Sequence, residues 1–282
     1  MMSNPNHLIV FTDLDACLLD DLYSFESANE ALGKIAEMNI PLVLNSSKTL
    51  DELTFIAKQF PKAPFLIAEN GTNLAVPIDS PLANIIHSNE TISGYRCIYE
   101  KGVHGRIMEI INMLKNKYNY KFRCFSEMSD EEVSNLTGLD QSSSVRAKNR
   151  ISSEPIIWQG SKGEWIEFNS ALSSLSINAV RGGQFIHLMN SAYDKGLGMI
   201  NMLSLFKQYN SELDWVSVAV GDSSNDIPML ENADYAIVIQ NPKHGKLSIS
   251  NPNCYVSDLF SSKGWNEGVL NFLSKSLNIV KL

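Results

Sequence analysis

The sequence predicts an α/β protein in which a parallel-sheet core domain is interrupted by an inserted α+β domain. Short apolar runs without polar alternation, at residues 8–11, 41–44 and 216–220, are typical of buried parallel strands. The pattern of the chain changes near residue 83 and resumes near residue 190. We therefore expect core residues 1–82, an insertion at 83–189 and core residues 190–282.

The first part of the core is expected to begin with a β-α-β unit. Apolar residues at helical spacing between residues 28 and 36 separate the first two buried runs. Asp13 and Ser46 follow these runs, and a right-handed crossover would place both at the carboxyl ends of neighbouring strands. Thr49 and Glu52 form a capping-box pattern that predicts the start of a second helix. Apolar runs on either side of Asn70-Gly71 predict a hairpin.

The insertion and the second part of the core each contain patterns that predict helices and strands. Between 83 and 189 we expect a helix around 107–114, a strand at 121–125, a helix capped by Ser129 and Glu132, a polar stretch at 141–153 and a strand at 184–189. After it we expect a helix at 195–207, strands at 216–220 and 235–239, and a terminal helix around 269–277.

Composition limits the classes of function. The 282 residues are 44% hydrophobic and 19% charged, as expected of a globular protein with a large core. The net charge of -8 disfavours binding to nucleic acid or to an anionic membrane. The four cysteines are far apart in sequence, so neither a zinc ribbon nor a redox motif is expected. Since the first residues lack a signal-peptide pattern, we expect a cytoplasmic location.

Two acidic groups follow buried strands. Asp13 and Asp15 come after the first strand, and Asp222 and Asp226 come after the strand at 216–220. Each group alone could be a solvated or capped turn. Because open α/β sheets bind ligands at the carboxyl ends of their strands, a shared site is the better interpretation. Carboxylates without histidine or thiolate partners favour Mg²⁺ as the cofactor.

Hydroxyl and ammonium groups at the same edge favour phosphoryl transfer. Ser46 and Ser47 follow the second strand, Lys195 begins a helix where a cation is unfavourable without an anion, and Asn225 lies in the second acidic group. Such groups can neutralise the oxygens of a phosphoryl transition state while an aspartate attacks phosphorus. The alternatives are a surface lysine behind an Asp194 cap, a loop serine and a turn asparagine.

Four segments resemble the motifs of the haloacid dehalogenase superfamily: FTDLDACLLD, VLNSSKT, the Lys195-Gly196 pair and VGDSSNDIPML. The resemblance implies a Rossmann-like core with an inserted α+β cap, Asp13 as nucleophile and Asp15 as acid/base. It also implies phosphate binding by Ser46, Ser47, Lys195 and Asn225, and Mg²⁺ binding by Asp13, Asp15 through its main-chain oxygen, Asp222 and Asp226. Ala16-Cys17 and Ser223 depart from the usual motifs, in which Gly-Thr and Gly are common.

The insertion resembles the cap of mannosyl-3-phosphoglycerate phosphatases in the segments SEMSDEEVSNLTGLDQSSSVRAKNRISSEPIIW and RGGQFIHLMN. This resemblance implies hydrolysis of mannosyl-3-phosphoglycerate, in the biosynthesis of the compatible solute mannosylglycerate. Arginine is suited to bind a carboxylate such as that of glycerate, although a solvated helix face explains the basic residues of 146–150 equally well. The candidate cap residues for substrate are Arg146, Arg150, Arg181, Gly183 and Gln184.

Other functions stay open at this point. Glucosyl-3-phosphoglycerate, sucrose phosphate or another sugar phosphate are alternative substrates of the same class. A phosphosugar mutase would use the same phosphoenzyme, and a non-catalytic phosphosugar sensor would keep only the binding site. In each case we expect a phosphorylated small molecule as partner, with no nucleic acid and no membrane.

Overall fold

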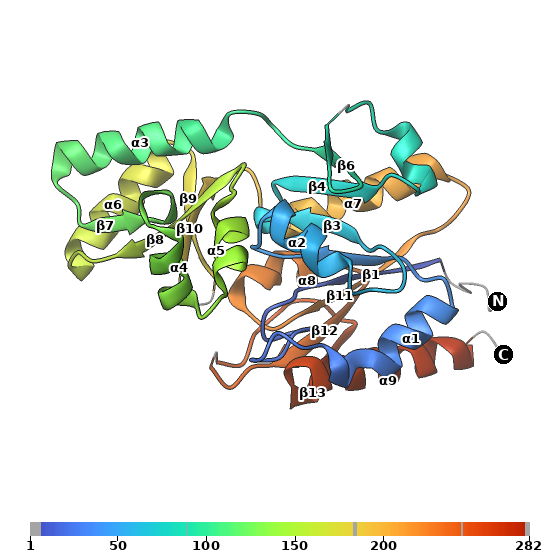
Figure 1. The fold of residues 1–282 in the computed structure, drawn as a ribbon. Helices are drawn as coiled ribbons and strands as arrows, with labels where there is room; N and C mark the ends of the chain where they lie inside the picture. The colour runs from blue at the N-terminus through green and yellow to red at the C-terminus, as the bar shows by residue number, and fades with distance from the viewer. Residues whose placement is uncertain (1–6, 89, 183–184, 244, 280–282) are drawn as a thin grey trace.

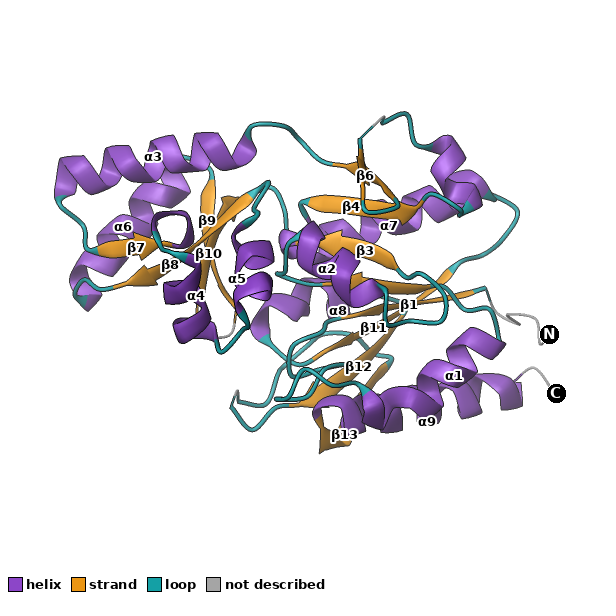
Figure 2. Cartoon of the chain, in the orientation of Figure 1, coloured by secondary structure: helices purple, strands orange, loops and turns teal. Residues whose placement is uncertain are grey.

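The computed structural model describes residues 7–88, 90–182, 185–243 and 245–279 and shows two lobes, each built on one β-sheet (Figures 1 and 2). The strands are β1 (Leu8–Thr12), β2 (Leu42–Asn45), β3 (Phe65–Ala68), β4 (Asn73–Pro77), β5 (Thr91–Ile92), β6 (Tyr95–Ile98), β7 (Phe122–Cys124), β8 (Ser153–Trp158), β9 (Ile177–Gly182), β10 (Phe185–Asn190), β11 (Val216–Gly221), β12 (Tyr235–Gln240) and β13 (Cys254–Phe260). The α-helices are α1 (Asn29–Glu37), α2 (Leu50–Ala57), α3 (Val103–Tyr118), α4 (Asp130–Thr137), α5 (Gln141–Lys148), α6 (Lys162–Ser174), α7 (Lys195–Tyr209), α8 (Ile227–Asn232) and α9 (Ser261–Ile279). Short 3-10 helices are η1 (Glu26–Ala28), η2 (Glu69–Gly71), η3 (Pro81–Ile85), η4 (Phe125–Glu127) and η5 (Ser224–Asp226).

The larger sheet contains nine strands within the described residues, in the order β13-β12-β11-β1-β2-β3-β4-β6-β5. The first six of these strands are parallel, and β4, β6 and β5 extend the sheet in antiparallel pairings. This confirms the predicted α/β class with a parallel-sheet core. β1 lies between β2 and β11. The strands that follow β1 in sequence are added on one side of it, and β11 and the later strands are added on its other side. This is the switch point at which open α/β sheets bind ligands.

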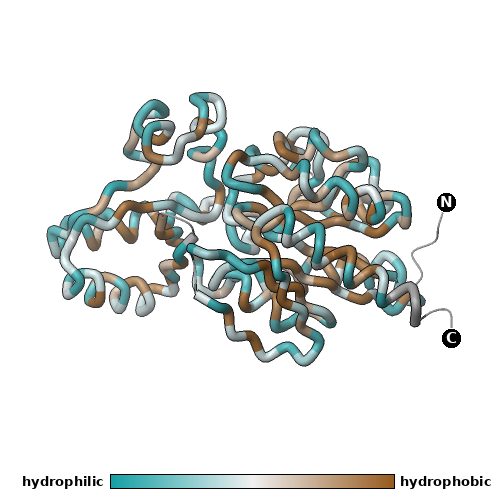
Figure 3. The backbone as a smooth tube through the Cα atoms, turned by 90° about the horizontal axis from the view of Figure 1, so that it is seen from below, coloured by the Kyte–Doolittle hydropathy of each residue, from teal (hydrophilic) through white to brown (hydrophobic). Residues whose placement is uncertain are grey.

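Helices cover both faces of this sheet. Alternate strand residues pack on one face against α1, α2 and α9, including the fully buried Trp265, and on the other against α7 and α8. Burial on both faces explains why the strands are apolar runs without alternation. Figure 3 shows the apolar segments concentrated in the interior of the larger lobe. No helix in the described ranges is both long and apolar enough to cross a membrane.

The smaller lobe is a four-stranded antiparallel sheet in the described residues, in the order β7-β8-β10-β9. One face packs against α3 and α6 through a core that includes Ile186 and Leu188 of β10. On the other face, Phe185 and Ile157 pack against Phe125, Met128 and Val133, around the start of α4. This lobe is the α+β unit expected within the insertion.

Most predicted elements are present, and the differences have local causes. The capping boxes at Thr49 and Ser129 are formed. The polar stretch at 141–153 contains α5, which has few apolar residues and begins at the Asp140 cap. β5 and β6 fall inside the expected 83–189 insertion, yet both pair with the larger sheet. The division into 1–82, 83–189 and 190–282 stays a proposal.

The two lobes are joined through the buried side chain of Glu69. Its Oε1 accepts hydrogen bonds from the backbone N–H of Ile151 at 2.9 Å and from Asn73 Nδ2 at 3.0 Å. Its Oε2 accepts from the N–H of Ser152 at 3.0 Å and from Ser153 Oγ at 2.6 Å. The residue has φ 48°, a left-handed conformation that non-glycine residues adopt at a cost. The start of β8 is thereby held against the larger lobe.

Close packing of α7 on η2 generates a stability prediction. A Cβ on Gly198 would lie 2.6 Å from Gly71 Cα and 2.8 Å from Ile67 Cγ2. We expect Gly198→Ala to lower the free energy of unfolding by about 1–3 kcal/mol through overpacking, measured by urea denaturation. Gly33→Ala is the matched control, because a Cβ there meets no described atom within 4 Å. It should raise stability by about 0.5–1 kcal/mol, and equal effects of the two substitutions would contradict the packing explanation.

Candidate active site

Three neighbouring strands deliver the predicted polar residues to one edge of the larger sheet. Asp13 follows β1, Ser46 follows β2 and Asp222 follows β11, and all three are buried. The backbone N–H of Asp13 donates to Val220 O at 2.9 Å, which extends the β1–β11 pairing to the site. The adjacent parallel strands explain how residues far apart in sequence reach the same place.

Lys195 lies between two of the carboxylates. Its Nζ is 2.6 Å from Asp13 Oδ1 and 2.6 Å from Asp226 Oδ1, and its side chain is 1% exposed. Asp194 caps α7 by accepting from Leu197 N–H, which places Lys195 in the first turn. Burial would lower the pKa of Lys195, but the charges of Asp13 and Asp226 outweigh it and raise the pKa above its ordinary value. Lys195 is therefore a buried cation.

Asp226 organises the loop after β11. Its Oδ2 accepts from the backbone N–H groups of Asp222 at 3.1 Å and Ser223 at 3.0 Å, and from Ser223 Oγ at 3.1 Å. With Oδ1 on Lys195, both of its oxygens are already engaged. Asp222 Oδ2 accepts from Asn241 Nδ2 at 2.6 Å. Asp222 Oδ1 is buried and has no hydrogen-bond partner among the described residues.

The carboxylates of Asp13, Asp222 and Asp226 form a group that fits a metal ion. Each offers an oxygen within 4.8 Å of the others. Burial, and then repulsion from Asp226, raise the pKa of Asp13 to about 7 against the opposing effect of Lys195. Burial and the charges of Asp13 and Asp226 raise the pKa of Asp222 to about 8. A divalent cation would relieve this repulsion and give the unpaired Asp222 oxygen a partner, so the residues fit the expected Mg²⁺.

Asp15 lies beside this group and is more accessible. Its side chain is 45% exposed, and its Oδ1 is 2.9 Å from Lys48 Nζ. Burial lowers the pKa of Lys48, but the charges of Asp15 and Glu52 outweigh it and raise the pKa above the ordinary value. Ala16 has φ 58°, a left-handed conformation that suits glycine. Glycine is common at this position in the haloacid dehalogenase motifs that the segment resembles. Asp15 is thus held by a cation at a turn.

The predicted phosphate ligands lie in two loops at this edge. Ser46 donates its backbone N–H to Ile67 O, and its Oγ accepts from Lys48 N–H at 3.3 Å. Asn225 accepts from Ser223 Oγ at 2.5 Å and donates Nδ2 to Asn70 Oδ1 at 3.2 Å. Asn225 therefore connects the loop after β11 to the one after β3. The roles of these residues in phosphate binding stay proposals.

The predicted substrate residues of the insertion are placed differently from one another. Arg150 donates Nη1 to Ser47 O at 2.8 Å and to Ser153 Oγ at 3.2 Å, which ties the smaller lobe to the loop after β2. The Arg146 guanidinium lies 3.9 Å above the Phe55 ring and donates to Ser143 Oγ. Arg181 is exposed on β9, which lies beside η5. Gly183 and Gln184 lie outside the described residues.

Sequence reasoning missed four residues that shape the site. Lys48 and Asn241 lie in loops and Glu69 begins η2, and only the complete fold shows which partners these three residues contact. Trp265 Nε1 donates to Thr12 Oγ1 at 2.8 Å, and Thr12 Oγ1 donates to Asp13 O at 2.7 Å. For Lys48, the sequence signal was its position directly after Ser46 and Ser47 at the end of the second strand.

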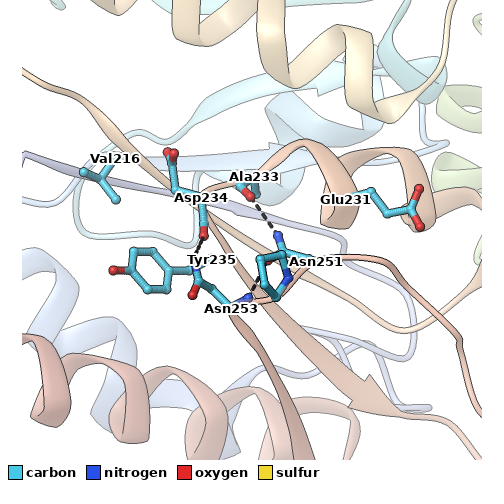
Figure 4. A pocket seen from close by; sticks show the side chains of 8 residues that line it. Val216, Glu231, Ala233, Asp234, Tyr235, Asn251 and Asn253 are labelled. Atoms are coloured by element: carbon cyan, nitrogen blue, oxygen red, sulfur yellow. Dashed lines mark hydrogen bonds between the residues drawn. The ribbon is translucent and has the colours of Figure 1, made fainter.

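A different hollow lies at the opposite edge of the sheet. It has a volume of about 430 Å³, and Val216 and Tyr235, which begin β11 and β12, help to line it (Figure 4). Its polar side chains serve local structure, since Asn251 Nδ2 donates to Leu230 O and Ala233 O. The acidic group is at the other end of these strands, so this hollow is not part of the candidate active site.

The chain is thus an α/β protein with two features: an acidic site at the carboxyl ends of a parallel sheet, and a second α+β lobe beside that site. The sequence model for haloacid dehalogenase-like hydrolases matches residues 10–251, and the chain belongs to this family. The predicted superfamily is therefore confirmed.

Solved structures of similar fold span almost the whole chain. SMU.1108c from Streptococcus mutans UA159 has 18% sequence identity and a TM-score of 0.64, covering 95% of this chain and 99% of its own. BT1666 from Bacteroides thetaiotaomicron, described among phosphatases of this superfamily, has 17% identity, a TM-score of 0.63 and coverage of 96% and 95%. The sucrose-phosphatase from Synechocystis sp. PCC6803 has 13% identity, a TM-score of 0.61 and coverage of 95% and 98%. At these identities the likeness shows the fold.

The acidic group generates a prediction about metal binding and pH. Burial and repulsion raise the pKa values of Asp13 and Asp222 to about 7 and about 8, so the metal-free fold is most stable while these acids are protonated. This stability falls as pH rises from the ordinary aspartate pKa of 3.8, and the loss is complete above about pH 8. A metal that replaces the protons should restore it. We expect the increase in Tm caused by Mg²⁺ to grow between pH 6 and pH 8.5.

The control for this measurement is Asp222→Asn, which removes one carboxylate and the repulsion together. It should abolish most of the Mg²⁺-dependent increase in Tm while leaving the metal-free protein folded. A Mg²⁺ effect that is constant across the pH range, or unchanged in Asp222→Asn, would contradict a metal site at this group.

Proposed function

We propose that the chain is a Mg²⁺-dependent phosphatase that hydrolyses a glycosyl-3-phosphoglycerate, with the mannosyl compound as the preferred substrate. The products are mannosylglycerate and phosphate. The observation that carries the reaction type is the Asp13 carboxylate held against the buried Lys195, with the carboxylates of Asp222 and Asp226 beside it. A nucleophile, a fixed cation and an acidic metal site in one place suit phosphoryl transfer.

In the first step, an Asp13 carboxylate oxygen bonds to phosphorus and the bond from phosphorus to the substrate oxygen breaks. Asp15 donates a proton to the departing alcohol. In the second step, Asp15 accepts a proton from water, the water oxygen bonds to phosphorus, and the bond to Asp13 breaks. The products are phosphate and the free Asp13 carboxylate. The partly exposed Asp15 side chain has the access to solvent that this exchange needs.

The other groups hold the phosphoryl oxygens. Lys195 supplies a fixed positive charge, and Ser46, Ser47 and Asn225 supply polar groups from two loops at the same edge. Asp13, Asp222 and the main-chain oxygen of Asp15 would hold Mg²⁺, which would neutralise phosphate charge. Asp226 would support this set, since both of its oxygens already bind Lys195 and the loop.

The choice of substrate rests on the insertion. Its resemblance to the cap of mannosyl-3-phosphoglycerate phosphatases favours a substrate with both a sugar and a carboxylate. Lys48 and Arg150 add positive charge where the smaller lobe meets the loop after β2, in a protein whose net charge is -8. Positive charge at this place supports an acidic substrate. The exposed Arg181 on β9 would extend the same surface toward η5.

The nucleophile is tested by Asp13→Asn. We expect turnover to fall at least about a thousandfold, because the amide cannot form the phosphoenzyme, while the Tm stays equal or rises as the buried repulsion is removed. The matched control is Asp21→Asn in the following turn, whose side chain is 78% exposed and pairs with Lys243 at the surface. This control should keep its activity, and near-native hydrolysis by Asp13→Asn would overturn the assignment.

The substrate is tested by phosphate release with Mg²⁺ from a panel of compounds. Mannosyl- and glucosyl-3-phosphoglycerate, sucrose phosphate, simple hexose phosphates and p-nitrophenyl phosphate cover the alternatives. We expect the highest kcat/KM for the mannosyl compound. Reaction in water labelled with heavy oxygen should place the label in the released phosphate, whereas a mutase would move phosphate between sugar positions without it.

A further inference from the structure

His187 is a buried histidine that the proposed reaction does not use. It lies in β10 between Ile186 and Leu188, which both point into the core formed with α3 and α6. Because side chains alternate across a strand, His187 points to the opposite face of the smaller sheet. Phe185 lies on that same face, where it packs near the start of α4.

The charged groups around His187 come from the site. Burial lowers the pKa of His187 well below its usual range, and the charges of Arg150, Lys48 and Lys195 lower it further. Lys195 binds Asp13, Lys48 binds Asp15, and Arg150 binds the loop after β2. The imidazole is therefore neutral. Met189, two residues further along β10 and on the same face, pairs with Ser153, and Arg150 donates to Ser153 Oγ as well as to Ser47 O. This face of β10 is therefore turned toward the loop after β2.

The buried side of this imidazole meets no hydrogen-bond partner among the residues that the structure describes. His187 is 4% exposed, and its Nδ1 has no hydrogen-bond partner within the described part of the chain. Its neighbours across the sheet are Pro155 and Val180, whose side chains have no polar atoms. A buried polar atom without a partner costs about 1–3 kcal/mol, so a structural role would be poorly served by histidine here.

We propose that His187 contacts the substrate and determines specificity by hydrogen bonding to a hydroxyl group of the departing alcohol. This inference rests on the proposed phosphatase function and deepens it. Because Nδ1 is buried, Nε2 would make this bond; in a neutral imidazole it donates or accepts according to the tautomer, and a hydroxyl group can do either. The surrounding cations are better suited to the phosphate and carboxylate groups. His187 would thus select a polyol or sugar portion over an apolar one.

The test compares substrates with and without hydroxyl groups. His187→Leu should lower kcat/KM for the best sugar phosphate of the panel about 10- to 100-fold, mainly through KM, and that for p-nitrophenyl phosphate less than about threefold. His187→Asn, which keeps a donor and an acceptor, should recover part of the loss. Because leucine removes an unpaired buried atom, the Tm of ligand-free His187→Leu should be equal or higher.

His104→Leu is the matched control in the same lobe. His104 Nε2 already has a partner, Glu154 Oε2 at 2.6 Å, so this change should lower the Tm without changing the ratio between the two substrates. An equal loss on both substrates in His187→Leu, or no loss on either, would overturn the proposal for His187.

A binding measurement separates this proposal from the proposed function. In Asp13→Asn, which cannot turn over, His187→Leu should reduce the increase in Tm caused by glucose 6-phosphate and leave that caused by inorganic phosphate unchanged. An unchanged response to both would refute the role of His187 even if hydrolysis is observed. Failure of the wild type to hydrolyse any compound would refute the phosphatase function, and the two thermal shifts would still decide the role of His187.

Discussion

The site depends on one buried ammonium group, that of Lys195. Three carboxylates meet at the edge of the larger sheet, and burying carboxylates is strongly unfavourable unless they are paired. Lys195 contacts Asp13 and Asp226, and no cation among the described residues contacts Asp222. One positive charge cannot balance three negative ones, and the excess explains why the pKa values of Asp13 and Asp222 are both raised. The same excess makes the site attractive to a divalent cation.

The surrounding structure fixes the groups before any ligand arrives. Trp265 donates to Thr12, and Thr12 donates to the carbonyl group of Asp13, so Asp13 is supported by the helix layer behind the sheet. Close packing at the start of α7 leaves no room for a side chain at Gly196, where a Cβ would lie 2.6 Å from Pro228 O. Groups held in this way need little rearrangement when charge develops during a reaction.

The parallel strands and the residues at their ends could be predicted because both have local signals. Buried runs specify strands, and the β-α-β pattern places the residues that follow them, such as Asp13 and Asp222, at one edge. The partners of Lys48 and Glu69 could not be predicted, because each pair joins segments that only the complete fold brings together. The hydrogen bond from Arg150 to the backbone oxygen of Ser47 could not be predicted either. A guanidinium group can donate to an anion or to a backbone oxygen, and the sequence does not show which one it meets.

The bonds of Glu69 also determine how the smaller lobe can swing. A rotation that keeps the hydrogen bonds from Glu69 to residues 151–153 must turn about that point. Arg150, next to this pivot, would then travel little, whereas the Tyr118 end of α3, which extends away from the larger lobe (Figure 1), would travel furthest. The smaller lobe would behave as a lever hinged beside the acidic group. Its far side could open to admit a bulky molecule while its near side keeps its position.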